Sequence, residues 1–413
     1  MLLILILVIA RLFALAGFIM LVVQVLLTSR LPVFKPFIPY DRLTKIHRSA
    51  GIVAAVLIFI HVLLIGTTKV MTGSLTVAPF TWFGVGSAVL LAAAVATALW
   101  YKRWSLKYET WRGLHLVMYL VFGLAFIHAL FSGTYLNSYS WLRVLWFVLA
   151  GLVGLVLLWR LFWVALMVSR PLSVVETIRE NHDTVTVRFK GKPFSHRSGQ
   201  FMFVRFPGRK SLKGSHPFTI SAPSNSEDLA ITAKAVGDFT SALPALEPGA
   251  KAWVEGPYGG FTLPVYRGSA GGGEKNSAGG KNADAAPLVF VAGGIGITPF
   301  LSILRELASL GAERRVLLVW GNKTEEDILR KEEIEGFRSK IDGFSVVHVL
   351  SEQKVWEGET GFIDMDLLGR YISDWEHTLF YLCGPPVMMK KLLADFSQVG
   401  IPMGRIAWER FAL

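Results

Sequence analysis

Five long apolar runs in the first 170 residues constrain this chain more than any other feature. They cover Leu2–Leu27, Leu43–Ile65, Phe80–Trp100, Trp111–Phe131 and Trp141–Val168. Each is about the 20 residues that a helix needs to cross a hydrocarbon layer about 30 Å thick. The sequence therefore predicts a five-helix membrane bundle. For the first run a cleaved signal peptide is the alternative, which its length and its lack of a basic start disfavour.

Charge divides the chain into two parts. Residues 1–170 hold 14 Lys and Arg but only two acidic residues, Asp41 and Glu109, so the net charge of +12 arises there. The remainder is electrically balanced, which excludes a nucleic-acid-binding domain as the source of the basic character. A single cysteine, Cys383, excludes an internal disulfide and an all-cysteine metal site.

The basic residues flank the apolar runs unevenly. Two loops and the end of the fifth run hold most of them, and the opposite connections hold only Lys69 and Arg143. The first group is Arg30, Lys35, Arg42, Lys45, Arg48, Lys102, Arg103, Lys107, Arg112, Arg160 and Arg170. Because cytoplasmic loops carry the excess of Lys and Arg, we expect an outside N-terminus. The prediction is a multi-pass protein of the cell (inner) membrane with a cytoplasmic C-terminal part.

Four of the nine histidines lie in the second and fourth runs, which cross the membrane in the same direction. They form two levels, an inner pair of His47 with His115 and an outer pair of His61 with His128. Histidine in hydrocarbon is costly and usually functional, and a neutral imidazole is a common axial ligand of haem iron. The pattern predicts two haem b sites about 20 Å apart. The alternative is that these histidines bond backbone carbonyls or lipid headgroups at helix ends.

The spacing of the histidines differs between the two runs. His47 and His61 are 14 residues apart and return to nearly the same helix face, whereas His115 and His128 are 13 apart. Thirteen residues leave the two side chains about 140° apart on a regular helix. The fourth run must therefore bend or rewind, or the two haems must be rotated, and we expect Gly123 to permit the change.

Arg11 stands alone in the middle of the first run. An unpaired guanidinium there is expensive, so it should face the bundle interior and meet an anion. A propionate of the outer haem, or the electron acceptor itself, is the predicted partner. Snorkelling to the membrane surface is the alternative.

The rest of the chain changes its pattern twice. Short alternating segments from Leu172 to about Trp253 predict a small antiparallel barrel. Residues 268–286 are rich in Gly, Ala and Ser and predict a flexible loop. Strands then alternate with helical segments, which predicts a doubly wound parallel sheet. The predicted domains are 1–170, 171–267 and 287–413, with the loop between the last two.

Several motifs in this part could carry chemistry, although each alone also fits a structural role. The segment His216–Ser221 (HPFTIS) places a rigid turn and hydroxyl groups on a strand. Gly237–Thr240 (GDFT) could offer amides to phosphate, and Gly256–Gly260 (GPYGG) is predicted to be a turn-rich hinge. At the first strand–helix junction of the parallel sheet, Gly293–Pro299 (GGIGITP) suits a pyrophosphate or a plain tight turn.

Together with Leu382–Pro386 (LCGPP) and the terminal ERFAL, these motifs resemble the NADPH oxidase / ferric reductase transmembrane family over nearly the whole chain. The resemblance implies a ferric reductase membrane bundle, a β-barrel FAD domain and an α/β nucleotide lobe like that of ferredoxin–NADP reductase. It implies FAD, two haem b and NADPH or NADH as cofactors. Electrons would pass to an extracytoplasmic acceptor, with dioxygen giving superoxide the first choice. A ferric chelate and a periplasmic partner protein are the alternatives.

The resemblance also assigns roles to residues. The four histidines would ligate iron, and Arg11, Thr219, Cys383 and Phe411 would lie nearest the reacting groups. The FAD positions would be His216, Pro217, Phe218, Thr219, Ile220, Ser221, Lys234, Gly237, Asp238, Thr240, Gly256 and Gly259. The nicotinamide nucleotide positions would be Gly293, Gly294, Gly296, Thr298, Pro299, Lys323, Cys383, Gly384 and Pro385.

Two of these assignments carry qualifications, and the chain departs from the family in its number of spans. Lys323 could meet the 2′-phosphate of NADPH, but its neighbours Asn322 and Thr324 also suit NADH. Phe411 would stack on the flavin, with a surface aromatic as the alternative. Family oxidases commonly have one more N-terminal span, and neither an EF-hand module nor a regulatory subunit is expected here.

Overall fold

The computed structural model describes residues 1–31, 40–74, 78–101, 103–106, 108–212, 214–263, 286–353 and 355–410. They form two compact units, a helical unit (Met1–Leu166) and a C-terminal unit (Met167–Leu413). Phe411 and nearly all of the predicted loop 268–286 lie outside the described residues. Each unit is described by itself.

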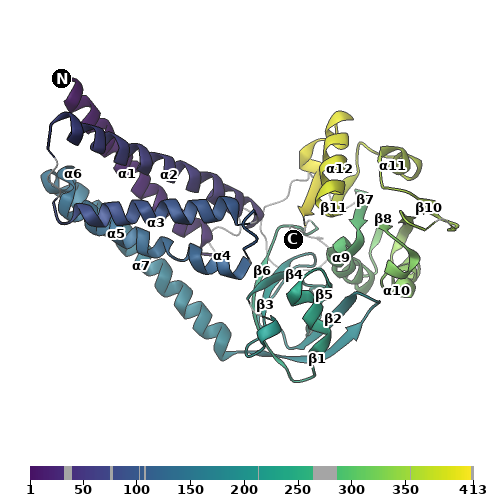
Figure 1. Ribbon diagram of the computed structural model, residues 1–413. Helices are drawn as coiled ribbons and strands as arrows, with labels where there is room; N and C mark the ends of the chain where they lie inside the picture. Colours follow the sequence, from purple (N-terminus) through teal and green to yellow (C-terminus); the bar gives the residue numbers. More distant parts are fainter. Residues whose placement is uncertain are drawn as a thin grey trace. The chain divides into compact units, whose positions relative to one another are not determined.

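The helical unit confirms the five predicted spans (Figure 1). Its helices are α1 (Leu2–Thr28), α2 (Tyr40–Met71), α3 (Thr81–Trp100), α4 (Tyr108–His115), α5 (Met118–Ser132), α6 (Thr134–Ser138) and α7 (Ser140–Ser169). Within the described residues, five helical segments are long and apolar enough to cross a membrane. The fourth is formed by α4 and α5 together, over Thr110–Ser132.

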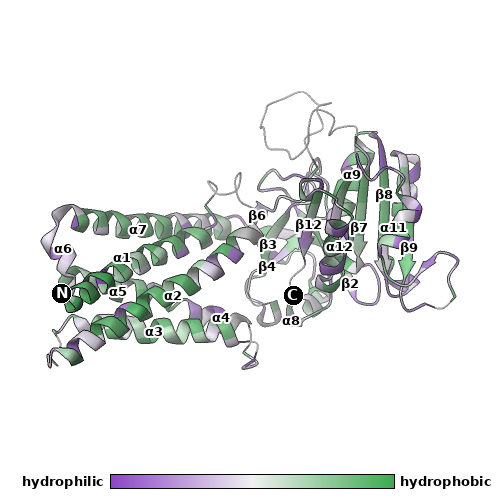
Figure 2. Cartoon of the chain, turned by 90° about the horizontal axis from the view of Figure 1, so that it is seen from above, coloured by the Kyte–Doolittle hydropathy of each residue, from purple (hydrophilic) through white to green (hydrophobic). Residues whose placement is uncertain are grey.

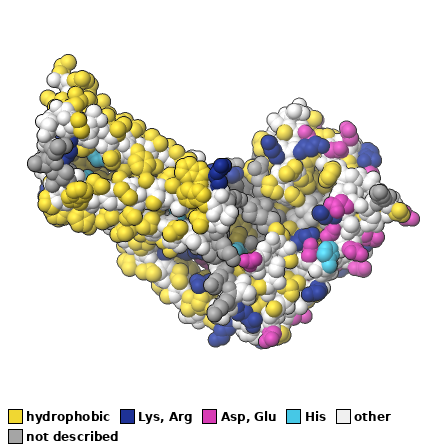
Figure 3. All heavy atoms as spheres, viewed as in Figure 1, with side chains coloured by type: hydrophobic (Ala, Val, Ile, Leu, Met, Phe, Trp, Pro, Cys, Tyr) yellow, Lys and Arg dark blue, Asp and Glu magenta, His cyan; other side chains and the backbone are white. Residues whose placement is uncertain are grey.

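Apolar side chains cover the outside of the helical unit. Figure 2 shows hydrophobic residues along α1, α2, α3, α5 and α7, and Figure 3 shows an almost continuous apolar surface over these helices. Leu63, Val89 and Leu155 each expose more than 60% of their area. An apolar surface of this extent on a soluble protein would drive aggregation, so it is the surface that faces lipid.

The fourth span is interrupted directly after His115. Helix α4 ends there and α5 begins at Met118, and the amides of Val117 and Tyr119 bond carbonyls three residues earlier, at Leu114 and Leu116. Each residue of such a tight turn advances about 120° instead of 100°. A few of them recover roughly half of the 140° mismatch between the two histidines. Of the three alternatives, a bend, a local rewinding and a rotation of the haems, the structure shows rewinding, and it lies after His115 rather than at Gly123, which is inside α5.

The first half of the C-terminal unit is an antiparallel barrel, as predicted. Its strands are β1 (Leu172–Arg179), β2 (Thr184–Lys190), β3 (Phe201–Arg205), β4 (His216–Thr219), β5 (Leu229–Lys234) and β6 (Lys251–Tyr258), in the order β4-β3-β6-β1-β2-β5. A bridge between Ile220 and Ile231 joins the two ends of this order, next to β4. The short helix α8 (Asp238–Ala242) follows β5.

The predicted hinge at Gly256–Gly260 is only partly correct. Gly256, Pro257 and Tyr258 belong to β6, and the chain leaves the strand only at Gly259. The register of β6 against β3 shifts at this place. Such an irregularity lets a strand carry a proline, which cannot donate a ladder hydrogen bond.

The second half is a parallel sheet with helices, which confirms the doubly wound prediction. Its strands are β7 (Leu288–Gly293), β8 (Glu313–Asn322), β9 (Asp342–Leu350), β10 (Glu359–Thr360), β11 (Leu379–Gly384) and β12 (Ile406–Arg410), in the order β10-β9-β8-β7-β11-β12. Its helices are α9 (Thr298–Ser309), α10 (Lys331–Gly336), α11 (Met365–Tyr371) and α12 (Pro386–Gln398). The strand order reverses between β7 and β11, the point where doubly wound sheets bind their ligands.

Polar contacts join the barrel to the parallel-sheet lobe. Ser302 on α9 donates to the Ala222 carbonyl at 2.7 Å, and Arg305 on the same helix donates to the Ser221 carbonyl at 2.7 Å. Arg330 donates to the Glu180 carboxylate from Nε at 3.0 Å. The two bonds from α9 hold the segment after β4 against this helix, and the Arg330–Glu180 contact joins the lobes at the end of β1.

Candidate functional site

Both histidines of the outer pair are held by backbone carbonyls from other helices. His61 Nδ1 lies 2.9 Å from the Ala10 oxygen of α1, and His128 Nδ1 lies 3.0 Å from the Phe80 oxygen at the start of α3. A carbonyl only accepts, so each ring donates from Nδ1 and carries its lone pair on Nε2. This tautomer and this kind of partner are those of metal-ligating histidines.

The inner pair has the separation that a shared metal requires. The ring centres of His47 and His115 are 6.1 Å apart and the rings are steeply inclined, at 80°. Two imidazoles bound to one metal from opposite sides, with metal–nitrogen bonds of about 2 Å, have centres about 6 Å apart. His115 Nδ1 is buried and has no hydrogen-bond partner among the described residues. The residues present therefore fit a haem at this level.

Two groups around these histidines escaped the sequence prediction. A side chain at Gly84 of α3 would meet the His128 ring at 2.8 Å, so this glycine makes room for the imidazole one turn after Phe80. Gln24 of α1 lies against His47, with its amide 2.6 Å from Nδ1. Gln24 could have been noticed in the sequence, because a glutamine is unusual in an apolar run. No pattern in the sequence distinguishes Gly84.

Arg11 follows Ala10, the residue of α1 whose carbonyl bonds His61. Its guanidinium carbon lies 5.4 Å from the centre of the Tyr135 ring. The partner that the structure describes is thus an aromatic ring, in a cation–π contact. The predicted anion remains a proposal.

The barrel places the HPFT segment on β4 as predicted. The His216 ring lies 4.2 Å from the Phe239 ring, and Phe218 stacks on Phe239 at 5.8 Å. The Thr219 hydroxyl is buried with no partner among the described residues, a cost that a bound polar group would remove. Ile220 and Ser221 are fully buried, whereas His216, Pro217 and Phe218 keep exposed surface.

One of the predicted phosphate-binding amides of GDFT, that of Gly237, makes a local hydrogen bond. The Thr240 hydroxyl accepts from the amides of Val236 and Gly237 at 2.9 and 3.1 Å and caps α8. Gly237 and Asp238 are exposed.

The glycines of the GPYGG segment lie close to aromatic side chains. A side chain at Gly256 would meet Phe194 at 3.1 Å, and one at Gly259 would meet the Phe201 ring at 3.0 Å. The positive φ of +93° at Gly259 also favours glycine. Neither glycine is shown to contact a cofactor.

Lys234, which was predicted to bind the cofactor, pairs with carboxylates of both lobes. Its ammonium lies 3.0 Å from Asp183 and 3.2 Å from Asp327. Partial burial opposes the charged form of Lys234, but these hydrogen bonds raise its pKa above the usual value. Burial likewise opposes ionisation of Asp327, whose pKa is lowered by the Thr324 amide and by Lys234. We assign these residues to the contact between the lobes.

Where the strand order reverses between β7 and β11, most of the glycines allow the ends of these two strands to pack closely. Side chains at Gly293, Gly296 and Gly384 would collide with Pro385, the Cys383 oxygen and Met388, at 2.6, 2.2 and 2.4 Å. Thr298 is buried and donates to the Ile295 carbonyl at 3.1 Å, and Pro299 is buried in the first turn of α9. Gly294 differs, because it has a φ of +52° and a methyl group added there would have no neighbour within 4 Å. It is the glycine of this loop that leaves space for a ligand.

The two remaining nucleotide positions differ in environment. Cys383 is fully buried, and burial raises the pKa of its thiol well above the usual value, so the thiol stays protonated. Lys323 is largely exposed and forms an ion pair with Glu352 at 2.8 Å, and this hydrogen bond raises the pKa of Lys323. The chain thus already supplies an anionic partner for the lysine that was predicted to meet a 2′-phosphate.

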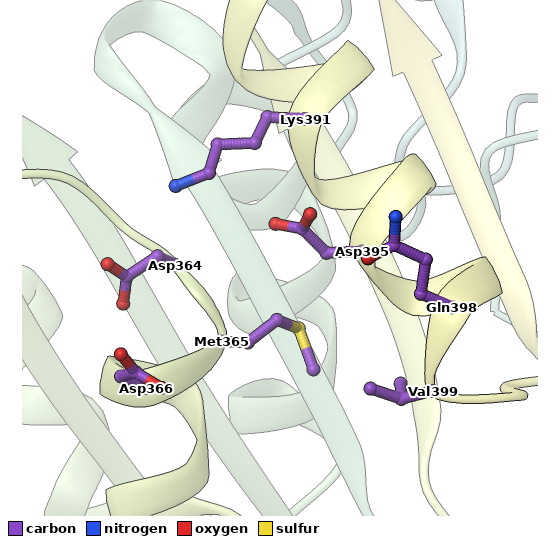
Figure 4. A pocket seen from close by; sticks show the side chains of 7 residues that line it. All are labelled: Asp364, Met365, Asp366, Lys391, Asp395, Gln398 and Val399. Atoms are coloured by element: carbon purple, nitrogen blue, oxygen red, sulfur yellow. The ribbon is translucent and has the colours of Figure 1, made fainter.

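Two cavities of the described residues lie away from these positions. One, of about 330 Å³, lies between α11 and α12 and is lined by Asp364, Met365, Asp366, Lys391, Asp395, Gln398 and Val399 (Figure 4). The other, of about 470 Å³, is lined by Leu136, Asn137, Ser138, Ser140, Arg143, Val144 and Phe147 of the helical unit. None of the predicted site residues lines either cavity.

Comparisons with known proteins assign each part of the chain. Residues 13–127 match the model of the ferric reductase like transmembrane component, residues 167–261 that of an FAD-binding domain, and residues 290–393 that of the oxidoreductase NAD-binding domain. The chain resembles the flavohemoglobin of Malassezia yamatoensis, with a TM-score of 0.51, 18% identity and coverage of 98% and 96% of the two chains. This likeness concerns the fold alone.

Curated relatives match about half of the chain. The reductase component of propane 2-monooxygenase from Gordonia sp. (strain TY-5) is 29% identical over 220 residues, 52% of this chain and 59% of that protein. The plasma membrane-associated coenzyme Q6 reductase of Saccharomyces cerevisiae is 30% identical over 210 residues, 49% of this chain and 61% of that protein. The chain spans about three fifths of the length of these two relatives.

The three domain matches agree with the two sheets and five spans of the structure. The chain therefore joins a multi-pass membrane component of the ferric reductase type to an FAD-binding domain and an oxidoreductase NAD-binding domain. The chain thus has the domain architecture of the NADPH oxidase / ferric reductase transmembrane family.

Proposed function

We propose that the chain carries electrons from cytoplasmic NAD(P)H, by way of FAD and two b-type haems at the inner and outer pairs, to extracytoplasmic dioxygen, giving superoxide. The observation that carries the proposal is the state of the outer pair. Both rings donate from Nδ1 to a carbonyl and so present an unprotonated Nε2 inside the bundle. When bound, the flavin takes up a hydride and the haems accept single electrons.

The residues of the chain hold these groups in place. Carbonyls of Ala10 and Phe80 fix the tautomer and direction of the outer ligands. In the barrel, the buried Thr219 hydroxyl is the proposed flavin contact. Where the strand order reverses, we propose that the nucleotide lies against Gly294 and Pro385, which keep exposed surface there. Cys383, protonated and buried, shapes the floor of this site. NADPH and NADH both remain candidate donors, because Glu352 competes for Lys323.

The cation beside the outer pair supports dioxygen as the acceptor. Arg11 follows Ala10 directly, and a positive charge there stabilises an anion as it forms. A ferric chelate is the second candidate, supported by the cavity of about 470 Å³ that Arg143 lines. Arg143 donates to Asn137 Oδ1 at 2.8 Å and to the Leu136 carbonyl at 3.3 Å, which holds this cation for an anionic ligand.

A comparison of the purified wild type with His128→Leu tests the function. The wild type should show a low-spin b-type difference spectrum with two centres, and the variant should lose the outer one. The variant should then lose superoxide formation by at least a hundredfold yet still reduce a soluble dye with NAD(P)H, because the flavin site is intact. A wild type without haem absorbance after haem supplementation would refute the proposal. Acceptor reduction that superoxide dismutase leaves unchanged would favour the ferric chelate.

A further inference from the structure

The cavity of about 470 Å³ in the helical unit lies where α6 is followed by α7. Its volume is within the roughly 300–1,000 Å³ of small-molecule sites. Figure 2 shows α6 as a more polar segment at the end of the hydrophobic α7. Because α7 is long and apolar enough to cross a membrane, the cavity lies at the end of a span, where hydrocarbon gives way to lipid headgroups.

The lining of this cavity is polar in one part and apolar in another. The polar groups come from α6 and the first turn of α7: Asn137, Ser138, Ser140 and Arg143. Val144 and Phe147 of α7 supply an apolar wall and expose 62% and 52% of their area. A soluble anion gains nothing from such a wall, whereas a molecule with a charged head and a hydrocarbon chain fits both parts.

Arg143 is held in place while part of its guanidinium keeps no partner. Its Nε donates to the Leu136 carbonyl at 3.3 Å and its Nη2 to Asn137 Oδ1 at 2.8 Å. Both acceptors are neutral, and among the residues that the structure describes Arg143 has no acidic partner. A guanidinium binds a phosphate or a carboxylate by charge-assisted hydrogen bonds. The Nη1 donors of Arg143 are therefore left for an anionic group in the cavity.

We propose that this cavity binds a phospholipid, whose phosphodiester pairs with Arg143 and whose acyl chain lies along Val144 and Phe147. The hydroxyls of Ser138 and Ser140 can donate to the ester oxygens of the same molecule. Charge complementarity and the place at the end of a span favour a lipid over a soluble anion. None of the four span histidines lines the cavity, so the inference does not depend on the proposed electron transfer.

Native mass spectrometry of the full-length, delipidated protein in detergent, titrated with phosphatidylglycerol, tests the inference through the affinity for the first lipid. Arg143→Gln removes the charge, and Lys69→Gln, which changes the other cation of these connections, is its matched control. Val144→Ser places a hydroxyl against the acyl chain. Its control is Leu158→Ser, because Leu158 lies on the same helix, exposes 63% of its area and does not line the cavity.

We expect Arg143→Gln to weaken phosphatidylglycerol binding about tenfold, the effect of one lost charge-assisted hydrogen bond. Val144→Ser should weaken it about threefold, since it disturbs roughly one buried methylene contact, and both controls should bind as the wild type does. Diacylglycerol, which has the chains but no phosphate, should bind about tenfold more weakly than phosphatidylglycerol, and equally to the wild type and Arg143→Gln.

Equal phosphatidylglycerol affinity in the wild type and Arg143→Gln overturns the inference, as does an equal loss in Lys69→Gln. If Arg143→Gln does not fold, equal binding by Val144→Ser and Leu158→Ser overturns it. Glycerol 3-phosphate or ferric citrate that binds as tightly as phosphatidylglycerol would assign the cavity to a soluble anion and also overturn it. A wild type without haem would refute the proposed function alone.

Discussion

In the helical unit, polar groups of neighbouring helices are directed at the histidines, whereas in the C-terminal unit most predicted motif residues contact one another. His61, His128 and His47 meet the Ala10 carbonyl, the Phe80 carbonyl and the Gln24 amide. Gly296, in contrast, packs on Cys383. Thr240 caps its own helix, and Lys234 pairs with Asp327.

The difference follows from the solvent of each unit. A polar side chain in hydrocarbon is too costly to remain without a partner or a function, so a histidine in a span is strong evidence of a ligand. In a water-exposed lobe, glycine and threonine in a motif first satisfy the backbone shape of a tight turn. Motifs in such a lobe show where the binding site lies, but most of their residues shape the backbone and the packing around it.

Among the substitutions that test this comparison, we expect the largest loss of stability at Gly296. A methyl group there would lie 2.2 Å from the Cys383 oxygen, a backbone atom with little room to move. Gly296→Ala should destabilise the C-terminal unit by about 3 kcal/mol, measured by thermal unfolding of the full chain. The control is Gly369→Ala in α11, where nothing lies within 4 Å. Equal melting temperatures would show that this glycine is not there for packing.

A smaller effect is expected at Gly84 in the helical unit. A methyl group would press on the His128 ring at 2.8 Å, and the ring can shift a little. Gly84→Ala should weaken outer haem binding about tenfold, a typical effect of disturbing the surroundings of a metal ligand, with the fold retained. Gly86→Ala in the same helix is the control, as its nearest neighbour is Leu124 at 3.9 Å. Loss of the inner rather than the outer haem spectrum would contradict the placement.

The smallest effect is expected at the contact between the lobes. The pKa of Asp327 is lowered and that of Lys234 raised. Stability from Asp327 is therefore present above its unfolded pKa, about 3.9, and lost as the pH falls through the lower folded value. Stability from Lys234 is present below about pH 10.4 and lost as the pH rises through the higher folded value.

Lys234→Met should cost about 1 kcal/mol at pH 7 and weaken the acid dependence, as measured by unfolding midpoints from pH 3 to 8. Asp327→Asn should remove the same acid dependence. If the unfolding midpoint of both variants still falls at low pH as in the wild type, the Lys234–Asp327 pair does not couple the lobes. Arg188→Met, which breaks an exposed pair with Glu176 inside the barrel, is the control and should change stability by no more than a few tenths of a kcal/mol.

Much of the fold could be read from the sequence, because each pattern has a direct physical cause. Runs of about 20 apolar residues have few alternatives to a membrane helix, and the five spans are confirmed. A change from period two to alternating strands and helices predicted the barrel and the parallel sheet. Histidine spacing predicted the two levels. The 13-residue interval required a bend, a rewinding or rotated haems, and of these the structure shows a rewinding after His115.

What the tertiary structure alone decided is which polar groups meet. The place of the rewinding, after His115 rather than at Gly123, depends on the packing of α4 and α5. The partners of the histidines come from α1 and α3, distant in sequence, and a backbone carbonyl such as that of Ala10 has no sequence signature. Likewise, Gly296 and Gly294 share one motif, yet only the neighbouring β11 makes the first a packing residue and leaves the second open. The sequence specifies local secondary structure and the position of a residue along a membrane span. Hydrogen bonds and steric contacts between distant segments exist only once the chain is folded.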